Sequence, residues 1–401
     1  MRNIKWLGIY FALVLLGLGC AAGTVYKIDP FMHYHQPDVD NYYYSLDNER
    51  SMNDGITKHF QYNALITGTS MTENFKTTEA DGIFGVESIK VPYSGGSYKE
   101  INDNLKVAFE YNPKLELVIR CLDMGRFFDS KDTMRNDLGD YPTYLYNHNP
   151  FDDVDYLLNR DILYGRCWEM IKSRYHGESG GITSFDAYAN WMPNYTFGSK
   201  TVLNNHEKFE NPQEEECLSL EEKNIIRENI TENVTDLADK YPDADFYYFI
   251  SPYSIVWWGE EQQKGRLDKD IAAEKYIIEL ILPHKNIHLY SWNTFYDITC
   301  NLNNYKDTTH YGIWINTHML NMMKNEVGLL TEDNYRTYIS EERLFYSNFP
   351  YNILFKENDL KHHMGIVEPL CSVKDSHGFM NVETFRNTCC NSQAGQCQIV
   401  T

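Results

Sequence analysis

The sequence predicts an α/β fold built on a parallel β-sheet. Short apolar runs alternate with stretches of helical spacing, and an alternation with these lengths is typical of βαβ units. The third run is apolar almost throughout, interrupted only by Glu116 and Arg120, as expected of a strand covered on both faces. The predicted strands span residues 62–66, 88–92, 115–122, 246–250 and 286–290.

The helices between these strands have recognisable starts and ends. Ser97 and Glu100 form a capping-box pattern, in which each side chain satisfies a backbone amide at the start of a helix. Apolar residues then recur at helical spacing until Asn112-Pro113 ends the helix. A similar pattern, from Ser219 to Glu222, opens a later one. The further predicted helices cover residues 220–240, 268–282 and about 313–324.

A long segment, residues 126–218, interrupts the alternation. Within it, residues 153–172 have a helical pattern, and the Gly- and Tyr-rich stretch 177–211 is typical of loops. We interpret 126–218 as an insertion over the active-site edge of the sheet, where it could form one wall of a substrate cleft.

The domain that contains the sheet is predicted to span residues 61–325, and residues 326–401 follow as a C-terminal extension. Periodicity fades beyond about residue 355, which favours a weakly ordered tail. That tail holds four of the nine cysteines, which are Cys371, Cys389, Cys390 and Cys397.

The N-terminus, residues 1–25, has the pattern of a membrane segment. Arg2 and Lys5 precede an apolar run that ends at Val25. We favour an uncleaved single-pass anchor in the cell membrane, with the bulk of the chain on the extracytoplasmic side, because the positive charges precede the run. A cleaved signal peptide is an alternative, and Cys20 raises lipoprotein processing as a third.

Residues 26–60 are rich in Tyr and lack periodicity, which predicts an extended linker from membrane to domain. His33 and His35 have the spacing of a metal pair, but no carboxylate or cysteine at ligand spacing joins them, and a surface position is favoured.

Charge and cysteine usage exclude some functions. The net charge of the 401-residue chain is −21 and no run of Lys and Arg stands out, so nucleic acid is not an expected partner. The central cysteines are scattered singly, without a C-x-x-C spacing, which argues against a zinc site. We expect no metal and no cofactor.

The first predicted strand ends in Gly68-Thr69-Ser70, where a hydroxyl sits at a possible helix start. A strand, a tight turn and a serine at a helix N-terminus are one way to build an activated nucleophile. The alternative is structural, because Ser70 and Glu73 also match a capping box.

Asp307-x-x-His310 follows the last predicted strand and is the most informative pair. An aspartate three residues before a histidine can contact Nδ1 and leave Nε2 to face a serine, as in a Ser-His-Asp system. Ser70, Gly95-Gly96 and Asp123 all follow strand ends, and the carboxyl ends of parallel strands are where such sheets bind ligands.

These motifs together resemble the SGNH (GDSL-like) hydrolase family over roughly residues 60–325. The resemblance rests on Gly68-Thr69-Ser70, the glycines after the second strand, a polar residue after the third and the late D-x-x-H. It implies a flavodoxin-like α/β/α sandwich. The chain looks most like the membrane-anchored extracytoplasmic branch, which includes the teichoic acid D-alanine transfer protein and the alginate and cellulose O-acetylation proteins.

The resemblance implies roles for individual residues. Ser70 would be the nucleophile, His310 the base and Asp307 its orienter, and the amides of Ser70 and of Gly95 or Gly96 would form the oxyanion hole.

Two positions depart from the family pattern. Thr69 stands where the family often has Asp, and Asp123 stands near the family's oxyanion asparagine. An ionised Asp123 would repel an oxyanion, so it is protonated, it turns away, or the third donor comes from elsewhere. Arg126 could neutralise it.

Three aromatic residues after the fourth strand, Tyr253, Trp257 and Trp258, could stack on sugar faces or pack beneath the insertion. The predicted function is serine-dependent acyl transfer or ester hydrolysis on O-acyl groups of a cell-surface glycopolymer. The resemblance implies a membrane-bound O-acyltransferase as partner. The alternative is a non-catalytic protein that binds glycan or serves as a scaffold in an envelope acylation complex.

Overall fold

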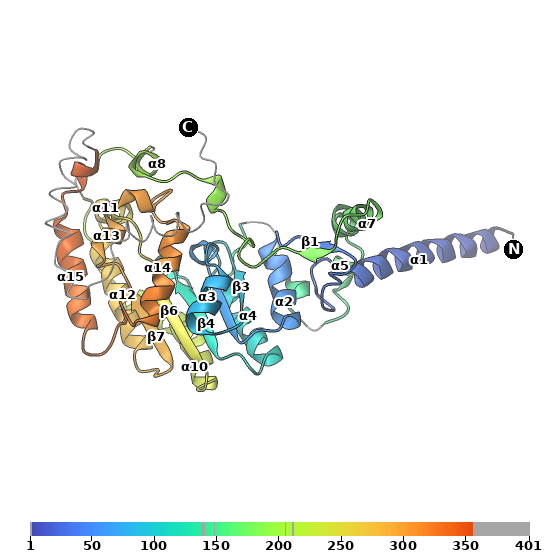
Figure 1. Ribbon diagram of the computed structural model, residues 1–401, viewed down its shortest axis with the longest axis horizontal. Coiled ribbons are helices and arrows are strands. Elements are labelled where there is room, and N and C mark those ends of the chain that lie inside the picture. The colour runs from blue at the N-terminus through green and yellow to red at the C-terminus, as the bar shows by residue number, and fades with distance from the viewer. Residues whose placement is uncertain (1, 138–140, 148, 205, 211, 356–401) are drawn as a thin grey trace.

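A five-stranded sheet in which all neighbouring strands are parallel forms the centre of the molecule (Figure 1). The computed structural model describes residues 2–355 except 138–140, 148, 205 and 211. The strands are β2 (Ala64–Gly68), β3 (Ser88–Pro92), β4 (Leu117–Leu122), β6 (Asp245–Ile250) and β7 (Ile287–Ser291). Their order, β3-β2-β4-β6-β7, is the flavodoxin-like order, so the predicted fold class is confirmed.

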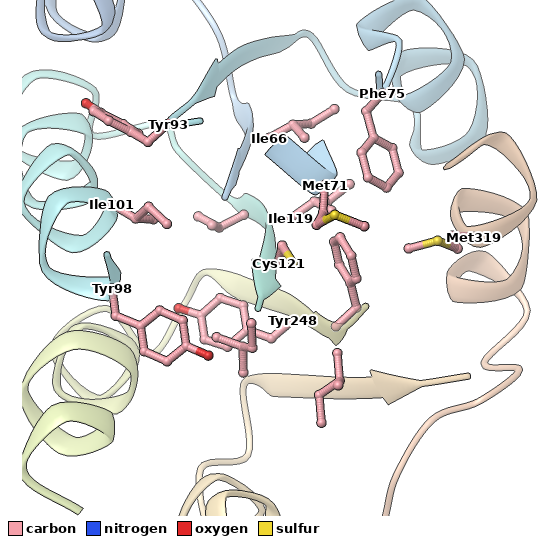
Figure 2. Close-up of a cluster of buried hydrophobic side chains, with 14 of the residues drawn as sticks. Ile66, Met71, Phe75, Tyr93, Tyr98, Ile101, Ile119, Cys121, Tyr248 and Met319 are labelled. Atoms are coloured by element: carbon pink, nitrogen blue, oxygen red, sulfur yellow. The ribbon is translucent and has the colours of Figure 1, made fainter. Parts of the chain in front are cut away.

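Helices cover both faces of the sheet, as the apolar strands require. Figure 2 shows Ile101 and Tyr98 of one helix on one side of β4, and Met319 of another helix on the opposite side. The helices that follow strands are α3 (Thr77–Phe84), α4 (Tyr98–Tyr111), α9 (Leu220–Ile230), α10 (Asp236–Lys240), α11 (Ile255–Gln263), α12 (Leu267–Ile281), α13 (Tyr296–Thr299) and α14 (Ile313–Lys324). A π-helical turn, Thr231–Thr235, joins α9 to α10, so the predicted helix 220–240 is continuous but not regular.

Arg120, the charged residue inside the apolar third strand, is fully buried. Its guanidinium donates to the carbonyl oxygens of Asn233 (2.7 Å) and Tyr98 (3.2 Å). It also lies over the rings of Tyr98 and Tyr248. These contacts replace water around the cation, which is how a buried strand tolerates it.

The N-terminal helix α1 (Arg2–Ile28) is long and apolar enough to be a membrane anchor or a signal sequence. Its final turns differ from the rest, because Val25 and Ile28 are buried while most of the helix is exposed. They pack beside α5 (Val154–Leu157) and a π-helical turn, Leu163–Cys167.

The linker predicted for residues 26–60 is instead packed structure. Residues Glu49–His59 form helix α2, and the two-residue strand β1 (Tyr43–Tyr44) pairs with β5 (Gly181–Ile182). Gly55 of α2 contacts the chain just after α1 so closely that a Cβ there would collide with the carbonyl oxygens of Phe31 and Met32. The helix itself packs on α4 and β3, which joins α1 to the central sheet through continuous contacts.

The insertion, residues 126–218, does not lie over the sheet edge as one unit. Its first residues lie against the turn after β3, through Arg126 and Arg135. Its middle part packs beside the end of α1, where Figure 1 shows α5 and α7 (Trp168–Tyr175). The helix predicted for 153–172 is broken there, because Asn159 Oδ1 accepts from the amides of Asp161 and Ile162 and so starts a new short helix, α6 (Arg160–Ile162). Residues from about 188 onward, including α8 (Ser199–Leu203), return to the sheet domain, where Gly198 donates to the Tyr305 carbonyl.

The C-terminal extension begins as ordered structure. Helix α15 (Tyr335–Asn348) packs along α12, and the turn Tyr351–Phe355 follows. The predicted weakly ordered tail and its four cysteines, in 356–401, lie outside the described residues. The five cysteines within the described residues, Cys20, Cys121, Cys167, Cys217 and Cys300, are free thiols.

Candidate active site

Ser70 lies at the carboxyl end of β2, in a turn that only glycine permits. Gly68 has φ +145°, and a Cβ at that position would come within 2.7 Å of side-chain atoms of Cys121 and Thr72. The chain then enters a short 3-10 turn, Ser70–Thr72, whose N-cap is Thr69. Ser70 is therefore not the cap that the S-x-x-E pattern suggested, and its hydroxyl is available for other contacts.

The hydroxyl of Ser70 faces His310, which in turn faces Asp307. Ser70 Oγ lies 2.8 Å from His310 Nε2, and His310 Nδ1 lies 2.9 Å from Asp307 Oδ2. Ser70 and His310 are half-buried, so the three groups are shielded but reachable. The arrangement has the connectivity of a serine nucleophile, a general base and an orienting carboxylate.

Asp307 is fixed by the loop that carries it. Its Oδ1 accepts from the backbone amides of Thr309 (3.0 Å) and His310 (2.7 Å). Burial by itself raises the pKa of the Asp307 carboxyl, but the contacts from His310 and Thr309 outweigh burial and hold the pKa well below its usual range. Asp307 is therefore an anion that accepts a hydrogen bond from the Nδ1–H group of His310 and leaves Nε2 to accept one from Ser70.

An aromatic wall beside the triad is formed by Trp191 and Tyr195, with Lys306 against both rings. The sequence motifs did not identify these residues. Trp191 Nε1 lies 3.4 Å from the Ser70 carbonyl oxygen, and its ring meets His310 edge to face at 5.6 Å. Lys306 Nζ lies 4.4 Å from the Trp191 ring centroid and 3.9 Å from that of Tyr195. The later part of the insertion thus supplies one wall of the site.

Asp123 contacts Thr69, the residue that precedes Ser70 in the turn after β2. Its Oδ2 accepts from Thr69 Oγ1 at 2.6 Å, while Oδ1 accepts from the Tyr253 hydroxyl and from the Gly125 amide at 3.0 Å. The side chain is buried, and these three donors satisfy both of its carboxyl oxygens. Of the alternatives left by the sequence, the structure shows the one in which Asp123 turns toward its own donors.

Arg126 does not neutralise Asp123. Its guanidinium donates to the Gly95 carbonyl at 2.5 Å and lies 3.5 Å from Asp129. It therefore fixes the turn after β3.

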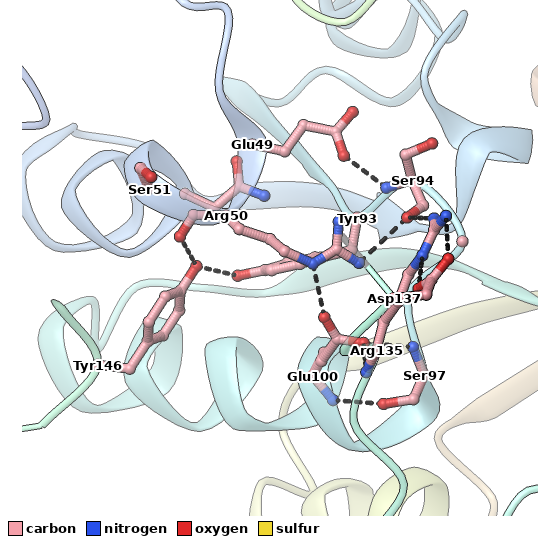
Figure 3. Close-up of polar contacts among 12 residues, drawn as sticks. Glu49, Arg50, Ser51, Tyr93, Ser94, Ser97, Glu100, Arg135, Asp137 and Tyr146 are labelled. Atoms are coloured by element: carbon pink, nitrogen blue, oxygen red, sulfur yellow. Dashed lines mark hydrogen bonds and ion pairs between the residues drawn. The ribbon is translucent and has the colours of Figure 1, made fainter. Parts of the chain in front are cut away.

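Polar contacts from α2 and the insertion hold the Gly95-Gly96 turn (Figure 3). The Ser94 amide donates to Glu49, and the Ser94 carbonyl accepts from Arg50 (3.1 Å) and Arg135 (2.5 Å). Figure 3 also shows Arg50 in contact with Glu100, at 2.8 Å. The segment predicted to be a linker therefore supports the edge of the candidate active site.

The predicted oxyanion donors differ in availability. The Gly96 amide donates to the Tyr93 carbonyl at 2.7 Å, so this turn already uses it. Within the described part of the chain, the amides of Ser70 and Gly95 have no hydrogen-bond acceptor. Gly95 has φ +57°, a left-handed conformation that favours glycine. The amides of Ser70 and Gly95 remain the candidate donors.

The three predicted sugar-stacking aromatics do not form a platform. Trp258 is fully buried and stacks on Tyr346 at 4.2 Å between centroids. Tyr253 is 4 % exposed and donates to Asp123. Only Trp257 is half-buried, with its ring against Tyr253 at 5.0 Å. A stacking surface made of all three residues is therefore wrong, and Tyr253 and Trp258 are packed instead. Trp258 packs against α15 and not beneath the insertion, as the alternative had it.

His33 and His35 contact separate partners. His33 Nε2 lies 3.5 Å from Asp153, and both ring nitrogens of His35 bond backbone carbonyl oxygens, those of Gln36 and Tyr26. In the described ranges, no group of three or more His, Cys, Asp or Glu side chains could hold a metal ion.

Comparisons with known proteins add little to this geometry. No family model matches the sequence, and no curated protein matches it. One solved structure that is similar is provisionally described as a platelet activating factor from Streptococcus pneumonia. It is 11% identical, covers 70% of this chain and 91% of its own, and has a TM-score of 0.35. We base no argument on a similarity of that size.

Proposed function

We propose that this chain is a serine-dependent esterase or acyltransferase of the SGNH type. The observation that carries the proposal is the continuous chain of contacts from Ser70 Oγ through His310 to Asp307. The proposal is supported by the position of these three residues at the carboxyl edge of a sheet with flavodoxin-like order, where such folds bind their ligands.

In the first half-reaction, Ser70 Oγ attacks the carbonyl carbon of an ester while His310 Nε2 removes the hydroxyl proton. The amides of Ser70 and Gly95 stabilise the oxyanion. The ester C–O bond breaks, His310 returns its proton to the departing alcohol, and an acyl-Ser70 ester remains. Asp307 accepts the Nδ1–H bond throughout and stabilises the imidazolium that forms.

In the second half-reaction, an incoming hydroxyl replaces the alcohol. Water gives hydrolysis and a free acid, and a sugar hydroxyl gives acyl transfer. His310 removes the proton of the incoming hydroxyl and returns it to Ser70 Oγ as the acyl bond breaks. The aromatic wall of Trp191 and Tyr195 offers ring faces and edges to a sugar acceptor. The natural substrate class in this proposal is the O-acyl groups of a cell-surface glycopolymer. For hydrolysis the acylated polymer is the ester attacked, and for transfer a polymer hydroxyl is the acceptor and a membrane-bound O-acyltransferase supplies the acyl group.

Helix α1 acts in this proposal as an uncleaved, single-pass anchor that holds the domain on the extracytoplasmic side. The burial of Val25 and Ile28 supports it, because cleavage near residue 25 would remove or expose side chains that the folded domain covers. N-terminal sequencing of the protein purified from membranes tests this, and a mature chain that begins after residue 25 would exclude the anchor.

The test of the activity is hydrolysis of p-nitrophenyl acetate by the purified full chain, with Ser70→Ala as the matched variant. We expect turnover by the wild type, loss of it in the variant, and labelling of Ser70 by a fluorophosphonate. A folded wild-type protein with neither turnover nor labelling would exclude the enzyme.

The non-catalytic alternative, binding a glycan or serving as a scaffold in an envelope acylation complex, is favoured by one observation. The Gly96 amide is already used, and Asp123 stands near the site of a third donor. Glycan binding that persists in Ser70→Ala, together with absent fluorophosphonate labelling of the wild type, would select this alternative.

A further inference from the structure

The segment of residues 151–175, here called the juxtamembrane segment, packs directly on the end of α1. Tyr156 stacks on Phe31 at 5.7 Å, and its hydroxyl donates to Asp29 at 2.7 Å. Arg166 lies over the Phe31 ring at 5.6 Å. Tyr156 and Cys167 are buried in this contact, so the segment is fixed relative to α1.

The position of this contact along α1 sets the height of the segment. The apolar run from Trp6 to Val25 is about 30 Å long at 1.5 Å per residue, which matches the hydrocarbon core of a bilayer. Tyr26 and Lys27 then mark the outer interface. Because Val25 and Ile28 are the residues buried beside the segment, it lies at the level of the lipid headgroups whenever α1 spans a membrane.

The segment is rich in exposed aromatic residues. Tyr164, Trp168 and Tyr175 are 62%, 54% and 87% exposed, and Phe151 and Val154 add further apolar surface. Such a concentration of exposed large apolar side chains marks an interaction site on a soluble surface. Tyr and Trp are also the residues enriched at membrane interfaces, because their rings combine an apolar body with a polar tip.

The second half of the segment, residues 160–175, contains four basic and two acidic side chains, in a protein of net charge −21. The first half adds Asp152, Asp153 and Asp155, so the excess of basic side chains is confined to residues 160–175. The basic residues are Arg160, Arg166, Lys172 and Arg174. Basic residues beside exposed aromatic residues, as in 160–175, are the composition of helices that lie in the plane of a membrane interface.

We propose that the juxtamembrane segment is a second membrane contact, in which Tyr164, Trp168 and Tyr175 enter the lipid headgroup region beside α1. The inference rests on the proposed anchoring by α1 and adds a lipid-binding surface to it. The domain then contacts the bilayer at two places, α1 and the juxtamembrane segment. Two contacts fix the tilt of the domain as well as its distance from the bilayer.

The experiment places the full chain in liposomes whose lipids are brominated near the carboxyl end of the acyl chains, where bromine quenches nearby tryptophan fluorescence. Wild type is compared with Trp168→Phe and with Trp257→Phe, a control on the sheet domain. Trp6 of α1 contributes equally to all three. We expect bromolipid to quench the emission that Trp168→Phe removes and to spare the emission that Trp257→Phe removes.

Equal quenching of wild type and Trp168→Phe would overturn the inference, given the same circular dichroism spectrum for both proteins. A chain that does not float with the liposomes would overturn both the anchor and the lipid contact. Ester hydrolysis measured in the same samples is independent of either result, so the failure of the catalytic proposal is recognised separately.

Discussion

Thr69 Oγ1 donates to Asp123 Oδ2 across 2.6 Å, which joins the turn that carries Ser70 to the end of β4. These are the two positions at which the sequence departs from the SGNH pattern. Because the hydroxyl donor and the carboxylate acceptor satisfy each other, the two departures form one compensated pair. The contact positions Ser70 without occupying its hydroxyl.

Thr69→Val should reduce activity more than it reduces stability. The change leaves a buried carboxylate oxygen without its donor, which costs about 1–3 kcal/mol, and it loosens the turn beside Ser70. Thr67→Val is the matched control, because Thr67 is also buried in β2 and donates to the Val91 carbonyl at 2.8 Å. Urea unfolding and kcat on p-nitrophenyl acetate distinguish the two, and equal kcat in both variants would contradict the positioning role.

Asp307→Asn should lower kcat by about 10⁴-fold while the protein stays folded. The asparagine amide would donate to His310 Nδ1 and so place the ring proton on Nε2, which could then not accept from Ser70. Asp268→Asn is the control, since that carboxylate pairs with Arg343 at the surface. Wild-type turnover in Asp307→Asn would show that Asp307 does not orient the base.

Lys306→Met should raise KM more than it lowers kcat. The methionine keeps the apolar stem but removes a cation–π contact with Trp191 and Tyr195, worth about 0.5–2 kcal/mol. The aromatic wall would then be less ordered. Lys324→Met, which removes a similar contact over Phe84 at 5.6 Å, is the control and should leave KM unchanged. A loss confined to kcat would indicate that Lys306 acts through Asp307 instead.

The stability of the protein should fall as pH rises from about 5 to 8, because of a buried carboxyl pair. Burial raises the pKa of Glu274 from 4.5 to about 7, and burial beside Glu274 raises that of Glu342 well above its usual range. The folded state therefore holds protons that the unfolded state releases. The contribution of this pair to the free energy of unfolding is fully present below about pH 4.5 and is lost as the pH rises through about 7.

Glu342→Gln tests this relationship, because the amide removes one charge and can donate to Glu274. We expect the thermal midpoint of this variant to vary less between pH 5 and pH 8 than that of the wild type. Glu279→Gln is the control, since Glu279 lies on helix α12 with Glu274 but is partly exposed and paired with Lys275. If the thermal midpoints of Glu342→Gln and wild type vary in parallel with pH, the Glu274–Glu342 pair is not the cause of the pH dependence.

The strands could be predicted because burial on both faces leaves an unbroken apolar signal. The bounds of β3 and α14 agree with the prediction to the residue. Helix α2 was missed because the residues it buries include Asn53, Asp54 and Thr57, which produce no hydrophobic period. Its stability depends on contacts with distant segments, such as Asn53 to the Pro92 carbonyl.

The candidate site was predictable where its parts are local. Asp307 and His310 are three residues apart, and Ser70 follows a strand end, so each has a signature within a short window. Trp191 lies 121 residues from Ser70 in a stretch without periodicity, and only the folded chain brings them together. The aromatic residues near 257 were misassigned because composition does not distinguish a stacking surface from a packed core.

The close contact between Gly55 and the chain at Phe31 and Met32 removes the slack that a flexible tether would give. With α1 in a membrane, the rigid packing would hold Ser70 at one distance from the bilayer surface. A tethered enzyme samples a volume set by its linker, whereas the proposed enzyme would reach only acyl groups at a fixed distance from the bilayer. Selection among polymer segments would then depend on their distance from the bilayer as well as on their chemistry.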